Sequence, residues 1–526
     1  MTLATALSAT LSGLEVELVR VEAQIERGVP SFDVVGLAEG AVRESRVRVR
    51  SALSRLGIEL SEHRIVVNLA PADTKKRGSG FDLAIAAAVL VALGHVDEKE
   101  TKDRAFLGEL SLTGELLSTR GVLPRVLGLL RLGVEEVVVP DANASEAAAI
   151  KRVKSFAVSS IEEWLESTRG ERALRRALPS TLREWAERGD DFSDLRGQAA
   201  ARRASEIAAA GAHNLLLIGP PGAGKTMIAR RLPSILPPIT DAEAIEATAV
   251  HSVAGLLRKN AGLLPTRPYR APHHTVSDVG LVGGGEWARP GEVSLAHRGV
   301  LFLDELPEFR RNALESLRQP LEDGSVTITR AHVRASYPAR FMLIAAMNPC
   351  PCGYLGTSRC SCRPELVRRY RERLSGPLLD RIDLHVTVQK VATESLLDPR
   401  ASESSETIRA RVLAAADRQA SRQNRLGLVA GKNAELAPRE LALAAPLETA
   451  ERNLLEGAAA KIELSARGFH RVLRVARTIA DLDASETVRS PHIAEALAYR
   501  PSDAHRPPAS QSVSSVTHHE RTQHHV

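Results

Sequence analysis

The segment Asn214–Thr226, NLLLIGPPGAGKT, joins an apolar run to a glycine-rich loop that ends in a lysine and a threonine. The run from Asn214 to Gly219 predicts a buried parallel strand. Gly219–Thr226 fits the phosphate-loop pattern, in which a glycine and four further residues precede Gly-Lys-Thr. A chance glycine-rich turn is the alternative, but the apolar run before the loop and the helix-compatible Met227–Leu232 after it favour a phosphate loop.

The residue types in this loop suit the binding of a nucleoside triphosphate. Gly222 and Gly224 allow backbone N–H groups to turn toward phosphate oxygens, where a Cβ atom would obstruct them. Lys225 places a positive charge near the β- and γ-phosphates, and Thr226 offers its hydroxyl to Mg²⁺ at the start of a helix whose dipole favours anions. The predicted ATP-binding residues are Gly219, Pro220, Pro221, Gly222, Ala223, Gly224, Lys225 and Thr226.

A second apolar run, Gly299–Leu303, delivers two carboxylates at its carboxyl end. Asp304 can hold Mg²⁺ through water, and Glu305 can polarise the attacking water as a general base. An Asp-Glu pair after an apolar run is common by chance. After a phosphate loop in the same chain, it indicates the second nucleotide motif.

A third expected strand, Phe341–Met347, ends in Asn348. At the end of a strand in the same sheet, the Asn348 amide can contact the γ-phosphate or orient the attacking water. An asparagine before Pro349 is on its own more often a turn former. Next to the two nucleotide motifs, we interpret Asn348 as a sensor of the γ-phosphate.

Size and composition indicate a soluble protein of several domains. The 526 residues are too many for one hydrophobic core, so about two to four domains are expected. The hydrophobic content of 44% and the charged content of 25% are typical of globular proteins. The sequence contains no run of about 18 apolar residues that would indicate a membrane span. The start MTLATALSATLSG lacks the basic region of a signal peptide, so we expect a cytoplasmic protein.

The net charge of +6 permits nucleic-acid binding without requiring it. Aromatic residues make up 3% of the chain, which argues against a protein that reads single strands mainly by base stacking.

The cysteines are confined to one short segment, which excludes a disulfide framework spread over the chain. Cys350, Cys352, Cys360 and Cys362 form a C-x-C, seven-residue, C-x-C arrangement. Four thiolates this close in sequence can form a tetrahedral Zn²⁺ site on a hairpin. The spacing differs from the C-x₂-C of standard zinc knuckles, and reduced surface thiols are the alternative. The position just after Asn348 predicts a structural clip near the nucleotide site rather than a catalytic metal.

Residues 1–185 are expected to form a separate α+β unit without a phosphate loop. Its expected elements are strands at 14–21, 63–69 and 135–139, helices at 39–56, 80–93 and 122–132, and a hairpin within 106–117.

This unit resembles the proteolytic domain of Lon proteases. The resemblance lies in the segments NLAP (Asn68–Pro71), KRGSGFDLA (Lys76–Ala84) and GVEEVVVP (Gly133–Pro140). Lon-type proteases use a serine and a lysine within hydrogen-bond reach of each other. The resemblance places the serine position at Gly80 or its neighbour Ser79, and the lysine position at Leu123. Because no lysine stands there, we expect a scaffold or adaptor rather than a peptidase.

The segment Thr181–Ala201 is charged and predicts a helical linker. Asp194–Gln198 is expected to open the next domain. In nucleotide-binding motors, a segment at this position before the phosphate loop often covers the adenine. Beyond the phosphate loop, Pro233–Pro238 is expected to break the helix. Gly283–Gly285 is typical of a flexible hairpin tip, between an expected helix at 243–255 and the second nucleotide motif.

The C-terminal part is expected to be helical. Residues 391–430 are compatible with helix and linker, Leu447–Asp481 has helical periodicity, and Ser490 begins a helix with Pro491 near its first position. From Pro501 onward Ser, Pro and His dominate, so residues 501–526 are expected to be disordered. The tail histidines are given no function.

Together these motifs resemble the YifB/ComM family of magnesium-chelatase-like AAA+ ATPases. The resemblance extends from the first residues to about Arg500. It rests on GPPGAGKT, HHTVSDVGLVGGG, RPGEVSLAHRGVLFLDELPEF, LRQPLEDG, AAMNPCPCG, LLDRIDLHV and SARGFHRVLRVARTIADL. It implies an α/β multidomain protein: a Lon-like domain at 1–185, an AAA+ parallel-sheet core at 190–390 and a helical lid at 391–500. It also implies a homohexameric ring, and ComM members are DNA helicases that promote branch migration during natural transformation.

The family match also assigns roles. It makes Lys225 and Thr226 phosphate-loop ligands, Asp304 and Glu305 the Walker B pair, and Asn348 sensor 1. The LLDRxD box places Arg381 as a finger that reaches a neighbouring subunit's nucleotide. There a planar cation stabilises the transition-state charge on the γ-phosphate oxygens. A surface ion pair between Arg381 and Asp383 is the alternative. In the lid, Arg467 matches sensor 2, and Arg474 is the second choice.

Two segments are candidates for DNA contact. Gly280–Trp287 resembles the helix-2 insertion of this AAA+ clade, and Val326–Ser336 resembles the hairpin before sensor 1. Strict alternation places Thr327, Thr329, Ala331, Val333 and Ala335 on one face of that hairpin, and Val326, Ile328, Arg330, His332 and Arg334 on the other. In a ring the hairpin can point into the pore, where Arg330, His332 and Arg334 would contact phosphates. An edge hairpin with solvated charges is the alternative.

The sequence therefore predicts an ATP-driven hexameric motor that acts on forked, branched or single-stranded DNA. A chelatase-like motor that remodels a protein partner is the first alternative. An ATP-dependent protease is disfavoured by Leu123. A protein that only binds ATP is least expected, because Glu305, Asn348 and Arg381 form a complete hydrolytic set.

Overall fold

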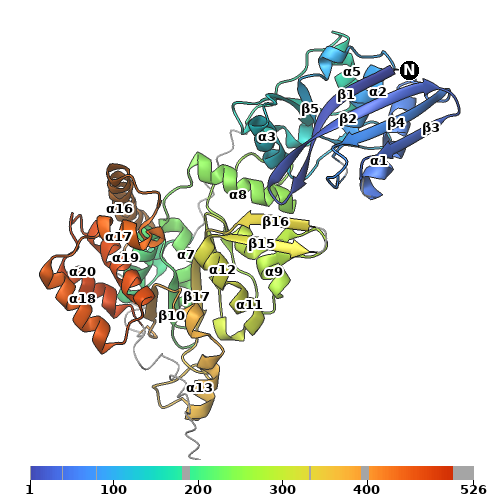
Figure 1. The fold of residues 1–526 in the computed structure, drawn as a ribbon. Coiled ribbons are helices and arrows are strands. Elements are labelled where there is room, and N and C mark those ends of the chain that lie inside the picture. Colours follow the sequence, from blue (N-terminus) through green and yellow to red (C-terminus); the bar gives the residue numbers. More distant parts are fainter. Residues whose placement is uncertain are drawn as a thin grey trace, which may run out of the picture.

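The computed structural model describes residues 2–37, 40–76, 78, 80–179, 190–330, 333–391 and 402–500, with only the backbone of residues 41 and 333. The expected tail at 501–526 lies outside these residues, as do residues 181–189 of the expected linker. Figure 1 shows an elongated molecule, with the N-terminal unit at one end beside α8 (Asp241–Ala254) and the lid helices on the far side of the core. No helix in the described part of the chain is long and apolar enough to cross a membrane.

The N-terminal unit is built on a seven-stranded mixed sheet in the order β3-β4-β2-β1-β5-β8-β9. Its strands are β1 (Thr2–Ser12), β2 (Glu15–Arg27), β3 (Ser31–Val35), β4 (His63–Ala70), β5 (Arg104–Phe106), β8 (Glu136–Pro140) and β9 (Lys154–Val158), with a separate hairpin of β6 (Glu109–Leu110) and β7 (Leu116–Leu117). Its helices are α1 (Gly40–Arg55), α2 (Asp82–Ala92), α3 (Val122–Arg131), α4 (Ala144–Ala148) and α5 (Ile161–Thr168). The start of the chain is thus a long strand that pairs with β2 along its whole length.

The core contains a five-stranded sheet whose strands are all parallel, in the order β11-β14-β17-β10-β18. These strands are β11 (Tyr269–Arg270), β14 (Val300–Leu303), β17 (Met342–Met347), β10 (Leu215–Ile218) and β18 (Leu384–Thr387). Parallel strands bring all their carboxyl ends to one edge of a sheet, and ligands bind there where the strand order reverses. The expected mixed α/β fold with a parallel-strand core is confirmed.

The remaining core elements surround this sheet. The helices are α6 (Ala199–Gly211), α7 (Lys225–Ile235), α8, α9 (Asp278–Val282), α10 (Glu292–Leu295), α11 (Arg311–Ser316), α12 (Arg318–Asp323), α13 (Pro364–Glu372) and α14 (Gly376–Leu379). Two hairpins, β12–β13 (Gly283–Gly284 and Arg289–Pro290) and β15–β16 (Ser325–Arg330 and Val333–Pro338), stand apart from the main sheet.

The helix ends within the expected segment Pro233–Pro238, but not at its first proline. Pro233 lies inside α7, which continues to Ile235. Leu236 then takes an extended conformation, as residues that precede a proline prefer. The pair Pro237–Pro238 therefore ends the helix.

The expected faces of the β15–β16 hairpin are also wrong in part. Arg330 pairs with Val333 across a two-residue turn, so residues of odd and even number share a face across the two strands. Thr329 consequently faces the same way as Arg334, while Ile328 shares the buried face with Ala335. Arg330 and Arg334 therefore point to opposite faces.

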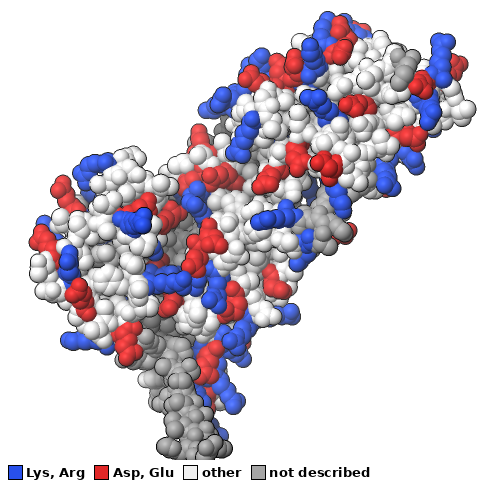
Figure 2. Space-filling view, viewed as in Figure 1, with Lys and Arg blue, Asp and Glu red and all other residues white. Residues whose placement is uncertain are grey.

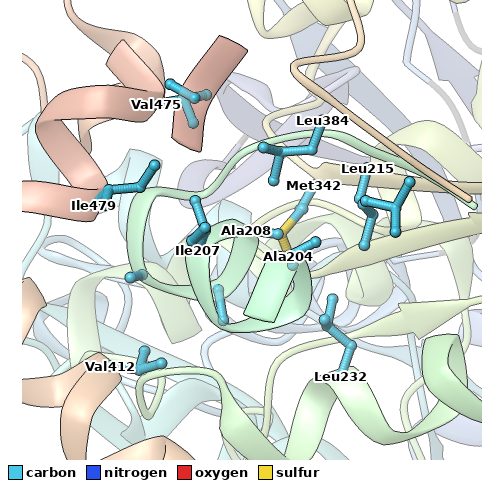
Figure 3. Close-up of a cluster of buried hydrophobic side chains, with 14 of the residues drawn as sticks. Ala204, Ile207, Ala208, Leu215, Leu232, Met342, Leu384, Val412, Val475 and Ile479 are labelled. Atoms are coloured by element: carbon cyan, nitrogen blue, oxygen red, sulfur yellow. The ribbon is translucent and has the colours of Figure 1, made fainter. Parts of the chain in front are cut away.

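The lid consists of α16 (Ser405–Leu426), α17 (Pro438–Ala444), α18 (Thr449–Lys461), α19 (Ala466–Leu482) and α20 (Ser490–Ala498). Its helices share one hydrophobic cluster with the sheet, because α6 lies between them (Figure 3). The cluster joins Leu215, Met342 and Leu384 of the strands to Val412, Val475 and Ile479 of the lid. Burial of this apolar surface fixes the lid to the sheet.

The N-terminal unit packs on α8 and on strand β16 of the β15–β16 hairpin. The backbone N–H of Gly121 donates to the Ser252 carbonyl at 3.2 Å, and Ala249 of α8 belongs to the hydrophobic cluster of α3. The Ser12 hydroxyl donates to the Arg334 carbonyl at 3.0 Å. The unit therefore contacts the strand that carries one of the predicted DNA-binding arginines.

Candidate nucleotide site

The loop after β10 turns sharply at the carboxyl edge of the core sheet. Gly222 and Gly224 have φ angles of +74° and +90°, which favour glycine. A Cβ atom on Gly219 would lie 2.2 Å from the Val388 carbonyl oxygen. Helix α7 begins directly after the loop at Lys225, so its N-terminal N–H groups face the space where phosphates would bind.

Lys225 is buried and its amino group is held within the loop. Its Nζ donates to the carbonyls of Gly219 at 2.7 Å and Pro220 at 3.0 Å, and to Oδ1 of Asn348 at 3.0 Å. Burial lowers the pKa of Lys225, while the charge of Asp304 opposes that shift. All three hydrogen-bond partners are neutral, so a phosphate would gain this cation without breaking an ion pair.

Thr226 and Asp304 meet at the first turn of α7. The Thr226 hydroxyl donates to Oδ2 of Asp304 at 2.7 Å, and the other carboxylate oxygen accepts the backbone N–H of Glu305 at 2.9 Å. Hydroxyl and carboxylate oxygens are the ligands that Mg²⁺ prefers beside nucleotide phosphates. The residues present therefore fit an ATP–Mg²⁺ complex.

Glu305 has the positive φ of 52°, a strained conformation for a residue with a side chain. Its Oε2 lies 3.3 Å from Nδ1 of His274, whose ring packs against those of His273 and Phe309. His274 was not predicted from the sequence, although the adjacent histidines His273 and His274 before the second nucleotide motif are a signal that could have indicated it.

Asn348 lies between the two nucleotide motifs, because β17 separates β10 from β14. Its hydrogen bond with Lys225 places it directly beside the loop. Gln198, at the end of the segment expected to cover the adenine, donates to the carbonyl of Ala223 at 3.0 Å. That segment thus contacts the phosphate loop.

Arg381 lies at the opposite edge of the sheet, where the strands begin. It precedes β18, and Asn214 at the start of β10 donates to its carbonyl at 2.9 Å. The buried guanidinium donates to the Pro377 carbonyl at 2.7 Å and pairs with Glu322 of α12. The Arg381–Asp383 pair considered from sequence is absent from the described residues, where Asp383 contacts Arg471 and His213 instead.

Arg467 of the lid joins this cluster, with Nη2 at 3.1 Å from the other oxygen of Glu322. Arg474 is engaged elsewhere, since its Nε and Nη2 donate to the Leu436 carbonyl at 2.9 and 2.5 Å. Hydrogen bonding by Arg381 and the charges of Arg381 and Arg467 lower the pKa of Glu322. The three arginines and Glu322 line a cavity of about 610 Å³ between the core and the lid.

The four cysteines converge after Asn348. Their Sγ atoms lie within 4.8 Å of one another, in a group that fits a metal ion. Cys350 is buried and the other three are partly exposed.

Two of the three predicted DNA-binding residues, Arg330 and Arg334, are exposed on the β15–β16 hairpin. His332 lies outside the described residues. Figure 2 shows both signs of charge interspersed over the visible face rather than one broad basic surface.

The described positions that would correspond to the peptidase dyad in the N-terminal unit contain no lysine, and an arginine lies beside one of them. Leu123 is fully buried on α3. A Cβ atom on Gly80 would lie 3.1 Å from Nη1 of Arg125, and burial lowers the pKa of Arg125 to about 10. A guanidinium that stays protonated cannot act as the base of a Ser–Lys dyad. Ser79 lies outside the described residues.

Comparison with known proteins identifies the family of this chain. The models of magnesium chelatase subunit ChlI match residues 191–396, with a further ChlI model at 21–143 and the ChlI C-terminal model at 402–500. The competence protein ComM of Haemophilus influenzae is 41% identical over 505 residues, covering 95% of this chain and 98% of that protein. The uncharacterized protein YifB of Escherichia coli is 41% identical over 495 residues, covering 93% and 96%.

The N-terminal resemblance also has a match. The archaeal Lon protease of Pyrococcus abyssi is 26% identical over 156 residues, which are 29% of this chain and 15% of that protease. Identity over nearly the whole length of ComM and YifB, together with the three ChlI models, decides the assignment. The chain belongs to the YifB/ComM family of magnesium-chelatase-like AAA+ ATPases.

Proposed function

We propose that this protein is an ATP-hydrolysing motor that works in the cytoplasm as a homohexameric ring and moves forked, branched or single-stranded DNA. The observation that carries the proposal is the division of the hydrolytic groups between two edges of one sheet. Lys225, Asp304 and Asn348 meet at the carboxyl edge, while Arg381 lies where the strands begin. A ring of identical chains would bring the Arg381 edge of one copy to the phosphate loop of the next.

The chemistry proposed is hydrolysis of the γ-phosphoanhydride. Glu305 accepts a proton from water as the water oxygen attacks the γ-phosphorus, and the bond to the β–γ bridging oxygen breaks with its electron pair leaving on ADP. Thr226 and Asp304 would hold Mg²⁺, which neutralises the developing phosphate charge. Asn348, which already bonds Lys225, would orient the water or the γ-phosphate.

The neighbour's Arg381 would supply the remaining positive charge. Its Nε donates to no group in the described part of the chain, so the guanidinium retains hydrogen-bonding capacity for a phosphate. Glu322 competes for the same cation in the single chain. Ring assembly around ATP would exchange this carboxylate for a γ-phosphate.

The family resemblance suggests DNA as the substrate, and the β15–β16 hairpin offers a place for it. Arg330 and Arg334 are exposed close to its turn, where they could neutralise phosphates. The buried face of the same hairpin packs on β12–β13, since a Cβ on Gly283 would lie 2.8 Å from Cδ1 of Ile328. The two hairpins therefore form one supported projection.

The test is steady-state ATPase activity with and without forked or four-way-junction DNA, with Glu305→Gln as the inactive control. Strong stimulation by branched DNA is expected. Arg330→Glu combined with Arg334→Glu should abolish the stimulation and keep the basal rate, whereas the exposed Arg169→Glu in the N-terminal unit should change neither. An ATPase indifferent to DNA would contradict the proposal and favour a motor that remodels a protein partner.

A further inference from the structure

The sulfur atoms of the cysteine loop have the spacing of a tetrahedral metal site. Cys350 Sγ lies 3.4 Å from Cys352 Sγ and 3.9 Å from Cys360 Sγ, and the latter two are 3.7 Å apart. Four thiolates at the usual Zn–S distance of about 2.3 Å stand about 3.8 Å from one another at the corners of a tetrahedron. The observed separations bracket that value, and Cys362 completes the group within 4.8 Å.

The loop backbone holds this arrangement. The Gly353 N–H donates to the Cys350 carbonyl at 2.9 Å, and the Cys360 N–H donates to the Thr357 carbonyl at 3.1 Å. The first turn encloses the Cys350–Cys352 pair, and the second leads into the Cys360–Cys362 pair. A closed set of four thiolates with no open position is typical of structural zinc rather than of a catalytic metal.

The same loop touches the nucleotide site. Gly353 has a φ angle of +85°, and a Cβ atom there would lie 2.5 Å from Cδ of Pro221 and 3.8 Å from Cγ of Asn348. Pro221 belongs to the phosphate loop, and Asn348 lies two residues before Cys350. The cysteine loop therefore supports the phosphate loop and the sensor residue from one side.

We propose that Cys350, Cys352, Cys360 and Cys362 bind one structural Zn²⁺ ion, and that this ion fixes the cysteine loop so that Gly353 buttresses Pro221 and Asn348. Metal binding is independent of the motor function proposed above. The coupling to nucleotide rests on the ATP site. Loss of zinc would leave the loop without its cross-link, and the phosphate loop would lose a rigid neighbour.

The metal content of the full-length protein tests whether the four cysteines bind zinc. Wild-type protein is expected to hold about one zinc per chain. Cys360→Ser combined with Cys362→Ser should lose it, whereas Ser358→Ala, an exposed change in the same loop, should keep it. Because the tail contains histidines, Co²⁺ substitution is the second readout: a thiolate-to-cobalt charge-transfer band is expected in wild type and Ser358→Ala only. Zinc that survives loss of the cysteines, iron in its place, or four free thiols in the native protein would overturn the site.

Two glycines of the loop test the coupling without touching a ligand. Gly353→Ala places a Cβ against Pro221, while Gly356, with a φ of +87°, has open space around its own Cβ position. Both variants carry similar backbone strain and should retain zinc. Affinity for a fluorescent ATP analogue should fall about tenfold in Gly353→Ala, because displacement of Pro221 would weaken the contacts of the phosphate loop by about the equivalent of one hydrogen bond. Equal affinities in the two alanine variants would overturn the coupling while leaving the metal site intact.

Discussion

The two edges of the core sheet differ in how they hold their positive charge. At the carboxyl edge, Lys225 bonds only to neutral oxygens of the loop and of Asn348. At the opposite edge, Arg381 and Arg467 share the carboxylate of Glu322. The cation at the carboxyl edge therefore has no anionic partner among the described residues, whereas the two arginines at the opposite edge are paired with the Glu322 carboxylate. In the proposed ring these edges would be the two halves of one hydrolytic site, and in a single chain they lie at opposite edges of the sheet.

Removal of the Arg381 cation is expected to have the largest effect on ATP hydrolysis. Arg381→Ala is expected to lower the ATPase rate by about 10³-fold or more, because a finger supplied in trans contributes that much to phosphoryl transfer. ATP affinity of the isolated chain should change little, since Arg381 lies away from its own phosphate loop. Arg373→Ala, which removes an exposed arginine paired with Glu308, is the matched control. Normal turnover in Arg381→Ala would show that the second edge takes no part in hydrolysis.

The carboxyl edge is tested by loss of its base. Glu305→Gln should lower turnover by about 10²- to 10⁴-fold, because the amide cannot accept the proton of the attacking water. Binding of ATP should persist, since Lys225 and Thr226 remain. Glu308→Gln, three residues away and exposed, should keep the rate of the wild type. Steady-state phosphate release measures the rate, and a comparable loss in both variants would contradict the assignment.

Asn348 is expected to have a smaller effect. Asn348→Ala removes an orienting amide and leaves the charges in place, so turnover should fall about tenfold to a hundredfold. Asn424→Ala, an exposed change on the lid, should have no effect. Single-turnover hydrolysis separates this loss from weaker ATP binding, and an unchanged chemical step would contradict a role for Asn348 in hydrolysis.

The carboxyl edge could be predicted from sequence because its motifs are contiguous. A phosphate loop fixes its own geometry through glycine conformations and the start of a helix, and an apolar run that ends in Asp304 and Glu305 identifies the next carboxylates. The strands β10, β14 and β17 lie where their apolar runs indicated. Local pattern and tertiary structure agree here.

The other edge could not be predicted in the same way. Glu322, Arg381 and Arg467 lie far apart in sequence, and only the fold brings them together. His274 and Arg125 were missed for the same reason. The hairpin faces were misassigned because a two-residue turn changes which residues share a face, and residue alternation alone does not reveal the turn.

The smallest expected effect concerns Glu322. Its lowered pKa keeps it ionised at neutral pH, and its hold on Arg381 is lost only as the pH falls through that lowered pKa. Glu322→Gln should lower the protein concentration needed for half-maximal ATPase activity about twofold to fivefold, in keeping with a partly exposed ion pair. Asp323→Asn is the neighbouring control. An unchanged concentration dependence would show that Glu322 does not compete with the nucleotide.

In the proposed ring, a second copy of the chain completes the nucleotide site. Mixing Lys225→Ala protein, which lacks its own phosphate-loop cation, with Arg381→Ala protein, which lacks the finger, tests whether this occurs. Each alone should be inactive, and the mixture should regain ATPase activity, because Arg381 of the first protein can reach the intact phosphate loop of the second. Each variant is also mixed with wild type to show that chains exchange. A mixture that stays as inactive as its parts, despite exchange, would contradict the account.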